Sequence, residues 1–208
     1  MERKGILLVV SGFSGAGKGT LMKELLRQHE NYALSISATT RAPREGEAEG
    51  REYFFKTREE FEEMIAREEL IEYACYVGNY YGTPRAYVEE QLARGRDVIL
   101  EIEIQGARKV KERFPDTVLL FVSPPSAQEL RRRLTDRGTE KQEVIESRLA
   151  RAAEEAEGIE DYDYFVINDD LNACVEHVHR IVECERSRTS RGEAQIQAIR
   201  EELKAFSK

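Results

Sequence analysis

The sequence predicts an α/β fold in which helices cover both faces of a parallel β-sheet. Four short apolar runs, rich in β-branched residues, recur along the chain at 6–10, 98–100, 118–122 and 165–167. Helical patterns follow most of them, at 18–28, 105–113, 126–135 and 170–186. Buried strands that alternate with helices are typical of a parallel sheet with both faces covered.

End residues mark several of these helices. Three starts carry a capping residue with its partner or with a proline: Thr57 with Glu60, Ser126 with Glu129, and Thr83 with Pro84. We therefore expect Thr83 to cap a helix over 84–94, which Gly95 ends as a C-terminal glycine. The helix 170–186 has an apolar stripe that predicts packing on the sheet: Leu171, Cys174, Val175, Val178, Ile181 and Val182.

Two polar stretches interrupt the alternation of strands and helices. The stretch 35–86 holds arginines around a proline, several glycines and many of the tyrosines, and the stretch 134–150 is rich in arginine. We interpret them as insertions on the ligand-binding edge of a single domain, 1–208, whose core comprises 1–34, 87–133 and 151–186. Residues 187–208 are predicted to form a charged C-terminal helical extension.

Composition narrows the classes of function. A net charge of −8 argues against a nucleic-acid-binding protein. The first apolar run is too short for a signal peptide or a membrane span. Three cysteines without a Cys-x-x-Cys spacing predict reduced thiols and a cytoplasmic protein. His177 and His179 lie two residues apart on a helix and so face different ways, which disfavours a metal site.

A glycine-rich segment between the first apolar run and the first helix predicts a site for the phosphates of ATP. It comprises nine residues: Gly12, Phe13, Ser14, Gly15, Ala16, Gly17, Lys18, Gly19 and Thr20. Glycines allow positive φ angles, so backbone N–H groups, the helix N-terminus and the lysine ammonium converge on one point. This is the phosphate loop (P-loop) pattern of nucleoside-triphosphate-hydrolase-like folds. Gly19 stands where Ser or Thr usually follows the lysine, so Thr20 is a displaced candidate magnesium ligand.

Arg41 and Arg44 indicate a second phosphate site. They lie three residues apart around a proline, stay charged at any working pH, and match phosphate oxygens in shape. Tyr53 and Tyr81 are candidates to add phenolic hydrogen bonds to the same anion. The arginine pair alone does not identify the ligand, because most such pairs are merely solvated.

These residues belong to a longer series of motifs. Along the chain it reads SATTRAPR at 37–44, GEAEGREY at 46–53, GNYYGT at 78–83, EIEIQG at 101–106, RLTDRGT at 133–139 and NDD at 168–170. The series covers almost the whole chain in order and resembles the guanylate kinases. The resemblance implies reversible, magnesium-dependent transfer of the γ-phosphoryl group of ATP to GMP, or dGMP, in purine nucleotide metabolism.

The resemblance also implies roles for individual residues. Four side chains would hold the GMP phosphate: Arg41, Arg44, Tyr53 and Tyr81. Four would face the guanine: Ser37, Glu72, Thr83 and Glu103. Three arginines would act with Lys18 on the transferred phosphoryl group, largely from a lid over 134–150: Arg133, Arg137 and Arg148. Asn168 would lie near the adenine of ATP.

The chemistry of guanine agrees with the role given to Glu72. Guanine presents N1–H and N2–H₂ as neighbouring donors, which one buried carboxylate can accept together, and Thr83 can donate to O6. Adenine has an acceptor at N1 and lacks the 2-amino group, so the carboxylate would repel it. From the sequence alone Glu72 reads as a solvated acid, because 58–72 is rich in glutamate. The resemblance reverses that interpretation.

Glu101 is the candidate carboxylate for the metal. It ends the apolar run 98–100, where an acid at the carboxyl edge of a sheet commonly serves a magnesium ion. Guanylate kinases often carry aspartate at the positions of Glu101 and Glu103. The extra methylene of glutamate leaves open how these two carboxylates divide between metal and guanine.

Three other functions are alternatives. A kinase for another monophosphate would suit the GKGT sequence, but Glu72, Thr83 and the RAPR string argue against it. A non-catalytic guanylate-kinase-like interaction module typically lacks the phosphate loop or the lid arginines, and the sequence retains both. A GTPase switch would carry an Asn-Lys-x-Asp motif, which the sequence lacks.

Overall fold

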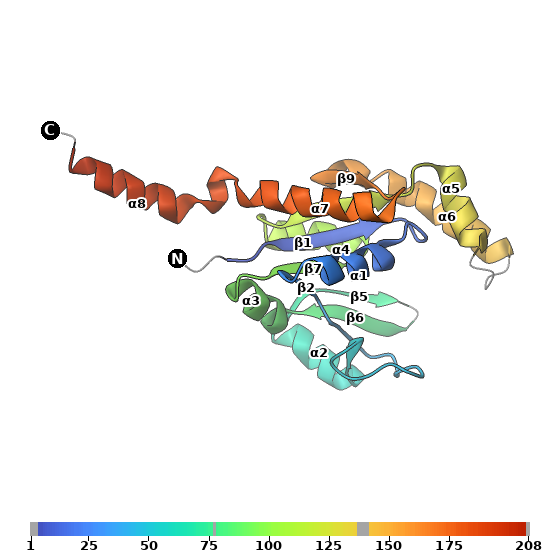
Figure 1. Cartoon of the computed structure of the whole chain (residues 1–208). Coiled ribbons are helices and arrows are strands. Elements are labelled where there is room, and N and C mark those ends of the chain that lie inside the picture. Colours follow the sequence, from blue (N-terminus) through green and yellow to red (C-terminus); the bar gives the residue numbers. More distant parts are fainter. Residues whose placement is uncertain (1–3, 77, 137–141, 207–208) are drawn as a thin grey trace.

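The computed structural model describes residues 4–76, 78–136 and 142–206. Its main sheet has five parallel strands in the order β2-β7-β1-β8-β9 (Figure 1). They are β1 (Leu7–Gly12), β2 (Tyr32–Leu34), β7 (Asp97–Glu101), β8 (Val118–Ser123) and β9 (Tyr164–Ile167). The predicted α/β class is therefore confirmed. Because β7 and β8 flank the central β1, the carboxyl ends of three neighbouring strands meet at one edge.

Helices cover both faces of the main sheet. α1 (Lys18–Gln28) and α7 (Leu171–Arg186) pack on one face, and α3 (Arg85–Ala93) and α4 (Ile104–Arg113) pack on the other. Successive residues of β1 alternate between the two faces. Leu8 and Val10 join the cluster with α1 and α7, including the predicted stripe of α7, whereas Leu7 and Val9 join the other cluster. Each such buried aliphatic side chain contributes about 1.5–3 kcal/mol.

Several predicted helix ends are confirmed. The capping box at the start of α2 (Arg58–Ala66) is complete, with reciprocal hydrogen bonds between Thr57 and Glu60. At the start of α5 (Ala127–Asp136), the Ser126 hydroxyl accepts from the N–H of Glu129. Gly95 follows α3 with a φ of +76°, a conformation that glycine adopts without strain.

The prediction that Thr83 caps a helix is wrong. Thr83 and Pro84 end strand β6 (Asn79–Pro84), and α3 begins at Arg85. The N–H of Arg85 donates to the carbonyl of Glu69, which extends the strand pairing to the helix start. The Thr83 hydroxyl donates at 2.8 Å to Glu72 on the partner strand. Tertiary pairing thus overrides the local capping signal.

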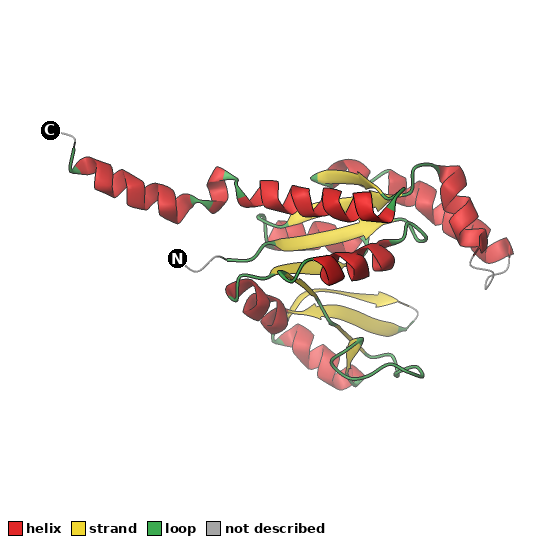
Figure 2. Cartoon of the chain, viewed as in Figure 1, coloured by secondary structure: helices red, strands yellow, loops and turns green. Residues whose placement is uncertain are grey.

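The insertion 35–86 contains a second sheet of four strands in the order β4-β3-β6-β5, with α2 packed against it (Figure 2). Its other strands are β3 (Ser37–Thr39), β4 (Tyr53–Phe55) and β5 (Leu70–Tyr76). Phe61 of α2 is fully buried against Ala38 and Leu70. This small core is separate from the two clusters of the main sheet.

Much of the predicted lid stretch is helical. α6 (Gln142–Ala156) packs against α5 through a cluster that includes Leu130, Leu134 and Ile145. Residues 137–141, which include the predicted lid residue Arg137, lie outside the described part of the chain. The division of the chain into core, insertion and lid stays a prediction in its detail.

The C-terminal region of the structure is mostly helical. Short 3₁₀ turns occur at Ile159–Asp161 and Thr189–Arg191, and α8 (Glu193–Lys204) extends away from the body of the molecule (Figure 1).

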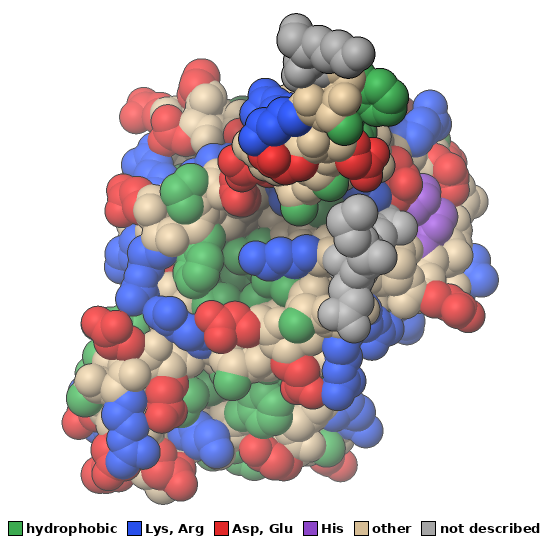
Figure 3. Space-filling view, turned by 90° about the vertical axis from the view of Figure 1, so that its left-hand side faces the viewer, with side chains coloured by type: hydrophobic (Ala, Val, Ile, Leu, Met, Phe, Trp, Pro, Cys, Tyr) green, Lys and Arg blue, Asp and Glu red, His purple; other side chains and the backbone are tan. Residues whose placement is uncertain are grey.

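On the face shown in Figure 3, basic and acidic side chains are interspersed. Cys75, Cys174 and Cys184 are free thiols. Within the described residues, every helix is too short or too polar to cross a membrane.

Candidate active site

The phosphate loop connects β1 to α1 at the centre of the sheet edge. Gly12 has a φ of +149°, and a Cβ atom there would lie 2.0 Å from the carbonyl oxygen of Val122. Gly17 is left-handed, with a φ of +88°, and forms the N-cap of α1. Because glycine has no side chain to cap the helix, the first-turn N–H groups face the loop and are suited to an anion.

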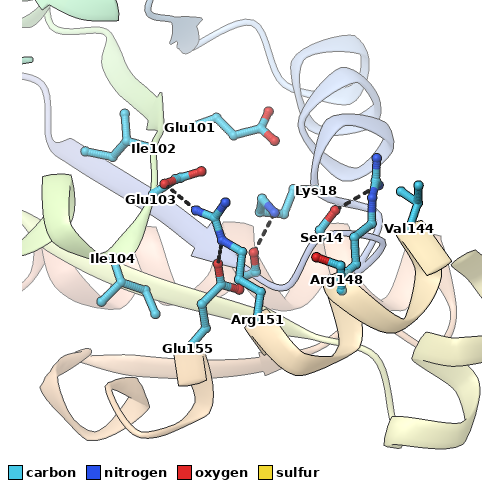
Figure 4. A pocket seen from close by; sticks show the side chains of 12 residues that line it. Ser14, Lys18, Glu101, Ile102, Glu103, Ile104, Val144, Arg148, Arg151 and Glu155 are labelled. Atoms are coloured by element: carbon cyan, nitrogen blue, oxygen red, sulfur yellow. Dashed lines mark hydrogen bonds and ion pairs between the residues drawn. The ribbon is translucent and has the colours of Figure 1, made fainter. Parts of the chain in front are cut away.

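Lys18 reaches across this loop. Its Nζ donates to the carbonyl oxygens of Gly12 at 2.7 Å and Phe13 at 3.2 Å. The ammonium lines a pocket of about 540 Å³, shared with Ser14 of the loop, Glu101 at the end of β7 and Arg148 of α6 (Figure 4). The predicted donor residue Lys18 therefore lies in a cavity of nucleotide-compatible size.

Two of the predicted lid-region arginines touch the phosphate loop. Arg148 donates to Ser14 Oγ at 3.1 Å, and Arg133 of α5 donates to the Ala16 carbonyl oxygen at 3.4 Å. Arg133 is oriented by Glu129, which accepts from its Nε at 2.7 Å. The cationic groups of α5 and α6 thus face the loop that would hold the donor phosphates.

Asn168 also contacts the loop. It follows β9, is almost fully buried, and donates from Nδ2 to the Ala16 carbonyl oxygen at 2.8 Å. A Cβ atom at Gly17 would lie 2.7 Å from this nitrogen. Asn168 therefore fixes the shape of the loop; its contact with adenine stays a prediction.

The predicted acceptor phosphate site is assembled on the second sheet. The guanidinium of Arg41 lies 5.3 Å from the ring centroid of Tyr53, and the rings of Tyr53 and Tyr81 meet edge to face at 6.2 Å. Arg41 is paired with Glu47 at 2.8 Å, and Glu47 also accepts from the backbone N–H of Arg44. The hydrogen bond from Arg41 lowers the pKa of Glu47. A carboxylate thus occupies the arginine fork that suits a phosphate.

Glu72 is a buried acid and not a solvated one. Its side chain lies on β5 with 8% of the residue exposed, and Oε1 accepts from the Thr83 hydroxyl at 2.8 Å. Burial raises the pKa of Glu72, and the hydrogen bond from Thr83 opposes this change. Ser37 is half-buried on β3, opposite Tyr53. The structure therefore brings Glu72 and Thr83 together as the resemblance implies.

Glu101 and Glu103 line the same pocket as Lys18. Glu101 ends β7 opposite Val10 of β1, and Glu103 is the N-cap residue of α4. Oε2 of Glu103 accepts from Arg151 Nη2 at 2.7 Å, and Nε of Arg151 donates to Glu155 at 3.0 Å. Burial raises the pKa of Glu155.

Arg151 and Glu155 were not predicted from the sequence. Both lie on α6, which crosses the predicted boundary between the lid 134–150 and the core 151–186, and they fall on the core side. Together with Arg148 they are spaced at i, i+3 and i+7, which places them along one face of a helix. That spacing is the signal that would have pointed to them.

The donor set fits a magnesium ion held mainly by substrate. Among the described residues, groups of three or more His, Cys, Asp or Glu side chains suited to a metal do not occur. Mg²⁺ commonly takes one or two carboxylates together with phosphate oxygens and water, and Glu101, which lines the pocket with Lys18, would be such a carboxylate. Thr20 is exposed on α1 and lies outside the residues that line the pocket.

The fold and these two sites define a class of protein. A phosphate loop on the central strand of a parallel sheet, with arginines facing it, is the donor site of a P-loop phosphotransferase. The arginine and tyrosine cluster of the second sheet, with the buried carboxylate of Glu72, is chemically suited to a separate acceptor.

Comparisons with known proteins narrow this class. The sequence profile of the family described as guanylate kinase matches residues 4–185. The chain is 53% identical to the guanylate kinase of Halalkalibacterium halodurans over 91% of its length and 93% of that protein. It is 50% identical to the Lactococcus lactis guanylate kinase, covering 92% and 93% of the two chains.

A solved structure agrees. The crystal structure of guanylate kinase from Anaplasma phagocytophilum is 36% identical in sequence, with a TM-score of 0.73 over 92% of this chain and 91% of that one. The chain belongs to the guanylate kinase family. Its class of reaction is the phosphorylation of GMP by ATP.

Proposed function

We propose that the chain catalyses ATP + GMP ⇌ ADP + GDP through the residues described above. The observation that carries this proposal is the buried pair of Glu72 and Thr83 beside the arginine and tyrosine cluster of the second sheet. A buried carboxylate with a hydroxyl neighbour matches the N1–H, N2–H₂ and O6 groups of guanine.

The donor phosphates bind at the phosphate loop in this mechanism. Backbone N–H groups at the start of α1 hold the β- and γ-phosphates, and Lys18 exchanges its loop carbonyl partners for phosphate oxygens. Arg133 and Arg148 approach the moving phosphoryl group from α5 and α6. Their contacts with Ala16 and Ser14 support this assignment. Arg137 is proposed as a third lid cation on the family resemblance alone.

The acceptor phosphate replaces Glu47 as the partner of Arg41. Two oxygens of a phosphate dianion satisfy the arginine fork better than one carboxylate shared with a backbone N–H. Arg44, Tyr53 and Tyr81 complete this site. Exchange of an internal anion for the substrate keeps the site assembled before GMP arrives.

Carboxylates and hydroxyls recognise the guanine base in this mechanism. We propose that ionised Glu72 accepts from N1–H and N2–H₂, that Thr83 donates to O6, and that Ser37 and Glu103 contact the base edge. Guanine donors favour the charged form of Glu72, so they offset the effect of burial on its pKa. The 2′-hydroxyl takes no part in this scheme, which makes dGMP a second acceptor.

Magnesium supplies charge neutralisation for the phosphates when it is bound. We propose that Glu101 holds it, with Thr20 as a secondary candidate, while Glu103 serves the base. The insertion 35–86 and the lid 134–150 close over both substrates and exclude water, which would otherwise accept the phosphoryl group. A cytoplasmic place in purine nucleotide metabolism, including GMP recycling, completes the proposal.

The decisive experiment measures ADP release with ATP against GMP, dGMP, AMP, CMP, UMP and dTMP. We expect turnover with GMP and dGMP, and little with the other four. Higher turnover with AMP would favour a kinase for another monophosphate. Tight GMP binding without ADP release would favour a non-catalytic interaction module.

The variant Glu72→Gln tests whether the buried pair of Glu72 and Thr83 recognises the base. Replacing one carboxylate oxygen by an NH₂ group opposes two donors, so kcat/KM for GMP should fall about 10- to 150-fold. The KM for ATP should change little, and discrimination against AMP should narrow. An unchanged GMP-to-AMP ratio would remove Glu72 from the base site.

A further inference from the structure

Helix α6 contacts two sides of the pocket through arginines one turn apart. Arg148 donates to Ser14 of the phosphate loop at 3.1 Å, whereas Arg151 donates to Glu103 at 2.7 Å (Figure 4). Residues three positions apart share a helix face. One helix therefore touches both the donor loop and the residue that starts α4.

Arg151 separates two carboxylates. Its Nη2 binds Glu103 and its Nε binds Glu155, which lies four residues further on α6. Burial raises the pKa of Glu155, and repulsion from Glu103 raises it further. The hydrogen bond from Arg151 lowers this pKa. A lone surface ion pair fixes little, but a planar guanidinium between two acids orients both.

Glu103 is also close to the proposed base site. It precedes the first turn of α4, and a Cβ atom at Gly106 in that turn would lie 3.3 Å from Oε2 of Glu72. The two acids therefore flank one helical turn. A carboxylate has two oxygens, so Glu103 can keep Arg151 on Oε2 while Oε1 serves a ligand.

We propose that Arg151 is a positioning residue that sets base specificity, by holding Glu103 so that Oε1 accepts from the 2-amino group of guanine. This inference rests on the proposed function. Without Arg151, Glu103 is repelled by Glu155 and loses the orientation in which it meets the 2-amino group. A purine that lacks the 2-amino group makes no such hydrogen bond, so the loss of Arg151 should not weaken its binding.

The test compares GMP with IMP, whose base keeps N1–H and O6 but lacks the 2-amino group. We expect Arg151→Gln to lower kcat/KM for GMP about 10-fold, chiefly through KM. The value for IMP and the KM for ATP should stay within about twofold. The GMP-to-IMP ratio therefore falls about 10-fold. Arg151→Lys keeps the charge without the planar fork and should give an intermediate ratio.

Arg94→Gln is the matched control. Arg94 is an exposed arginine directly after the last residue of α3, paired with Glu90 at the same four-residue spacing as Arg151 with Glu155. This variant should leave kcat/KM for GMP and the GMP-to-IMP ratio unchanged. Thermal unfolding checks that each variant is folded. If Arg151→Gln does not fold, the GMP-to-IMP ratio of Arg151→Lys tests the proposal instead.

A double-mutant cycle tests whether Arg151 acts through Glu103. In the Glu103→Gln background, Arg151→Gln should change the GMP-to-IMP ratio by less than about twofold. Additive effects, or an unchanged ratio in the folded single variant, would overturn the inference. If the wild-type enzyme fails to prefer GMP over AMP, the proposed function fails instead, so the two failures are distinguishable.

Discussion

Lys18 is the single side chain on which transfer depends most. Its ammonium lies at the loop carbonyls of Gly12 and Phe13, from which it can follow the phosphoryl charge. We expect Lys18→Ala to lower kcat about 10²-fold or more, a loss of about 3 kcal/mol of transition-state stabilisation. Thermal unfolding should be nearly unchanged, because the lysine contributes little to the core. Near-normal turnover would exclude the phosphate-loop assignment.

Arg41 and Arg44 should act on the acceptor alone. Substituting either by alanine removes a cation from the GMP phosphate site, so the KM for GMP should rise much more than that for ATP. Arg67→Ala is the control, since this exposed arginine pairs only with surface acids near the end of α2. Steady-state kinetics with each substrate varied in turn gives the comparison. An equal rise for ATP would mean that the two nucleotide sites are reversed.

Glu72 should make the free protein less stable at high pH. Burial raises its pKa above the unfolded-state value, so between those two pKa values the folded state binds more protons. Stability therefore falls as pH rises through this window, and the cost is absent below the unfolded pKa of about 4.3. Glu72→Gln should unfold at a higher temperature than the wild type at pH 8.

The measurement is a series of thermal unfolding curves without nucleotide between pH 4 and pH 8. The advantage of Glu72→Gln should shrink as the pH is lowered toward about 4. Glu89→Gln, a substitution at an exposed site on α3, should run parallel to the wild type. A wild type that is the more stable protein at pH 8 would show that the buried carboxylate carries no desolvation cost.

At the scale of elements, the main sheet was predictable and the second sheet was not. Strands such as β1 and β8 begin with continuous apolar runs of four and five residues, since both of their faces are buried. β3 and β4 have three residues each, and β4 is only half-buried, so both are too short to show a strand-length apolar run or a clear alternation. Their pairing depends on contacts across the insertion that short-range patterns do not contain.

The candidate site also has a part that was predictable from the sequence and a part that was not. The phosphate loop and the arginine pair are contiguous in sequence, so their chemistry was predictable. Glu72 was assigned only through the family resemblance, because its burial depends on β5 packing beside α4. Arg151 and Glu155 were missed because they fall in the predicted core 151–186, just beyond the lid 134–150, although one helix, α6, spans both. Local sequence thus predicts phosphate binding better than it predicts base recognition.

The insertion 35–86 and the lid 134–150 should be the moving elements. The insertion has a small hydrophobic cluster of its own, and the lid shares one with the flanking residues Leu130 and Ala152, so both can shift while most of the main core stays packed. Hydrogen exchange should show added protection in both segments when GMP and a non-hydrolysable ATP analogue are bound together. Each ligand alone should protect mainly its own segment. Equal protection with and without both ligands would contradict closure.

At the scale of the whole molecule, donor and acceptor sites belong to different cores. The phosphate loop extends from the main sheet, whereas the Arg41 and Glu72 sites are built on the second sheet. α6 contacts the loop through Arg148 and the start of α4 through Arg151. Transfer in line requires these parts to meet in one geometry. The separation of the cores lets the chain bind each nucleotide before the reactive arrangement forms.

The C-terminal extension should be dispensable for this reaction. Every residue of α8 except Ile196 is exposed, and the family match ends at residue 185. A chain that ends at Gly192 should therefore keep kcat and both KM values within about twofold. Its Tm should stay within about 2 °C of the full chain, because exposed residues contribute little to stability.

A shorter chain that ends at Arg186 provides the contrast. Glu185 is almost fully buried, accepts from the Tyr164 hydroxyl, and pairs with Arg188 and Arg191. Removing both arginines leaves a buried carboxylate without its cations, which costs on the order of 3 kcal/mol and lowers Tm by several degrees. Thermal unfolding and steady-state kinetics of the two truncated chains separate these effects. If the chain ending at Gly192 loses as much stability as the one ending at Arg186, then α8 itself packs on the body of the molecule.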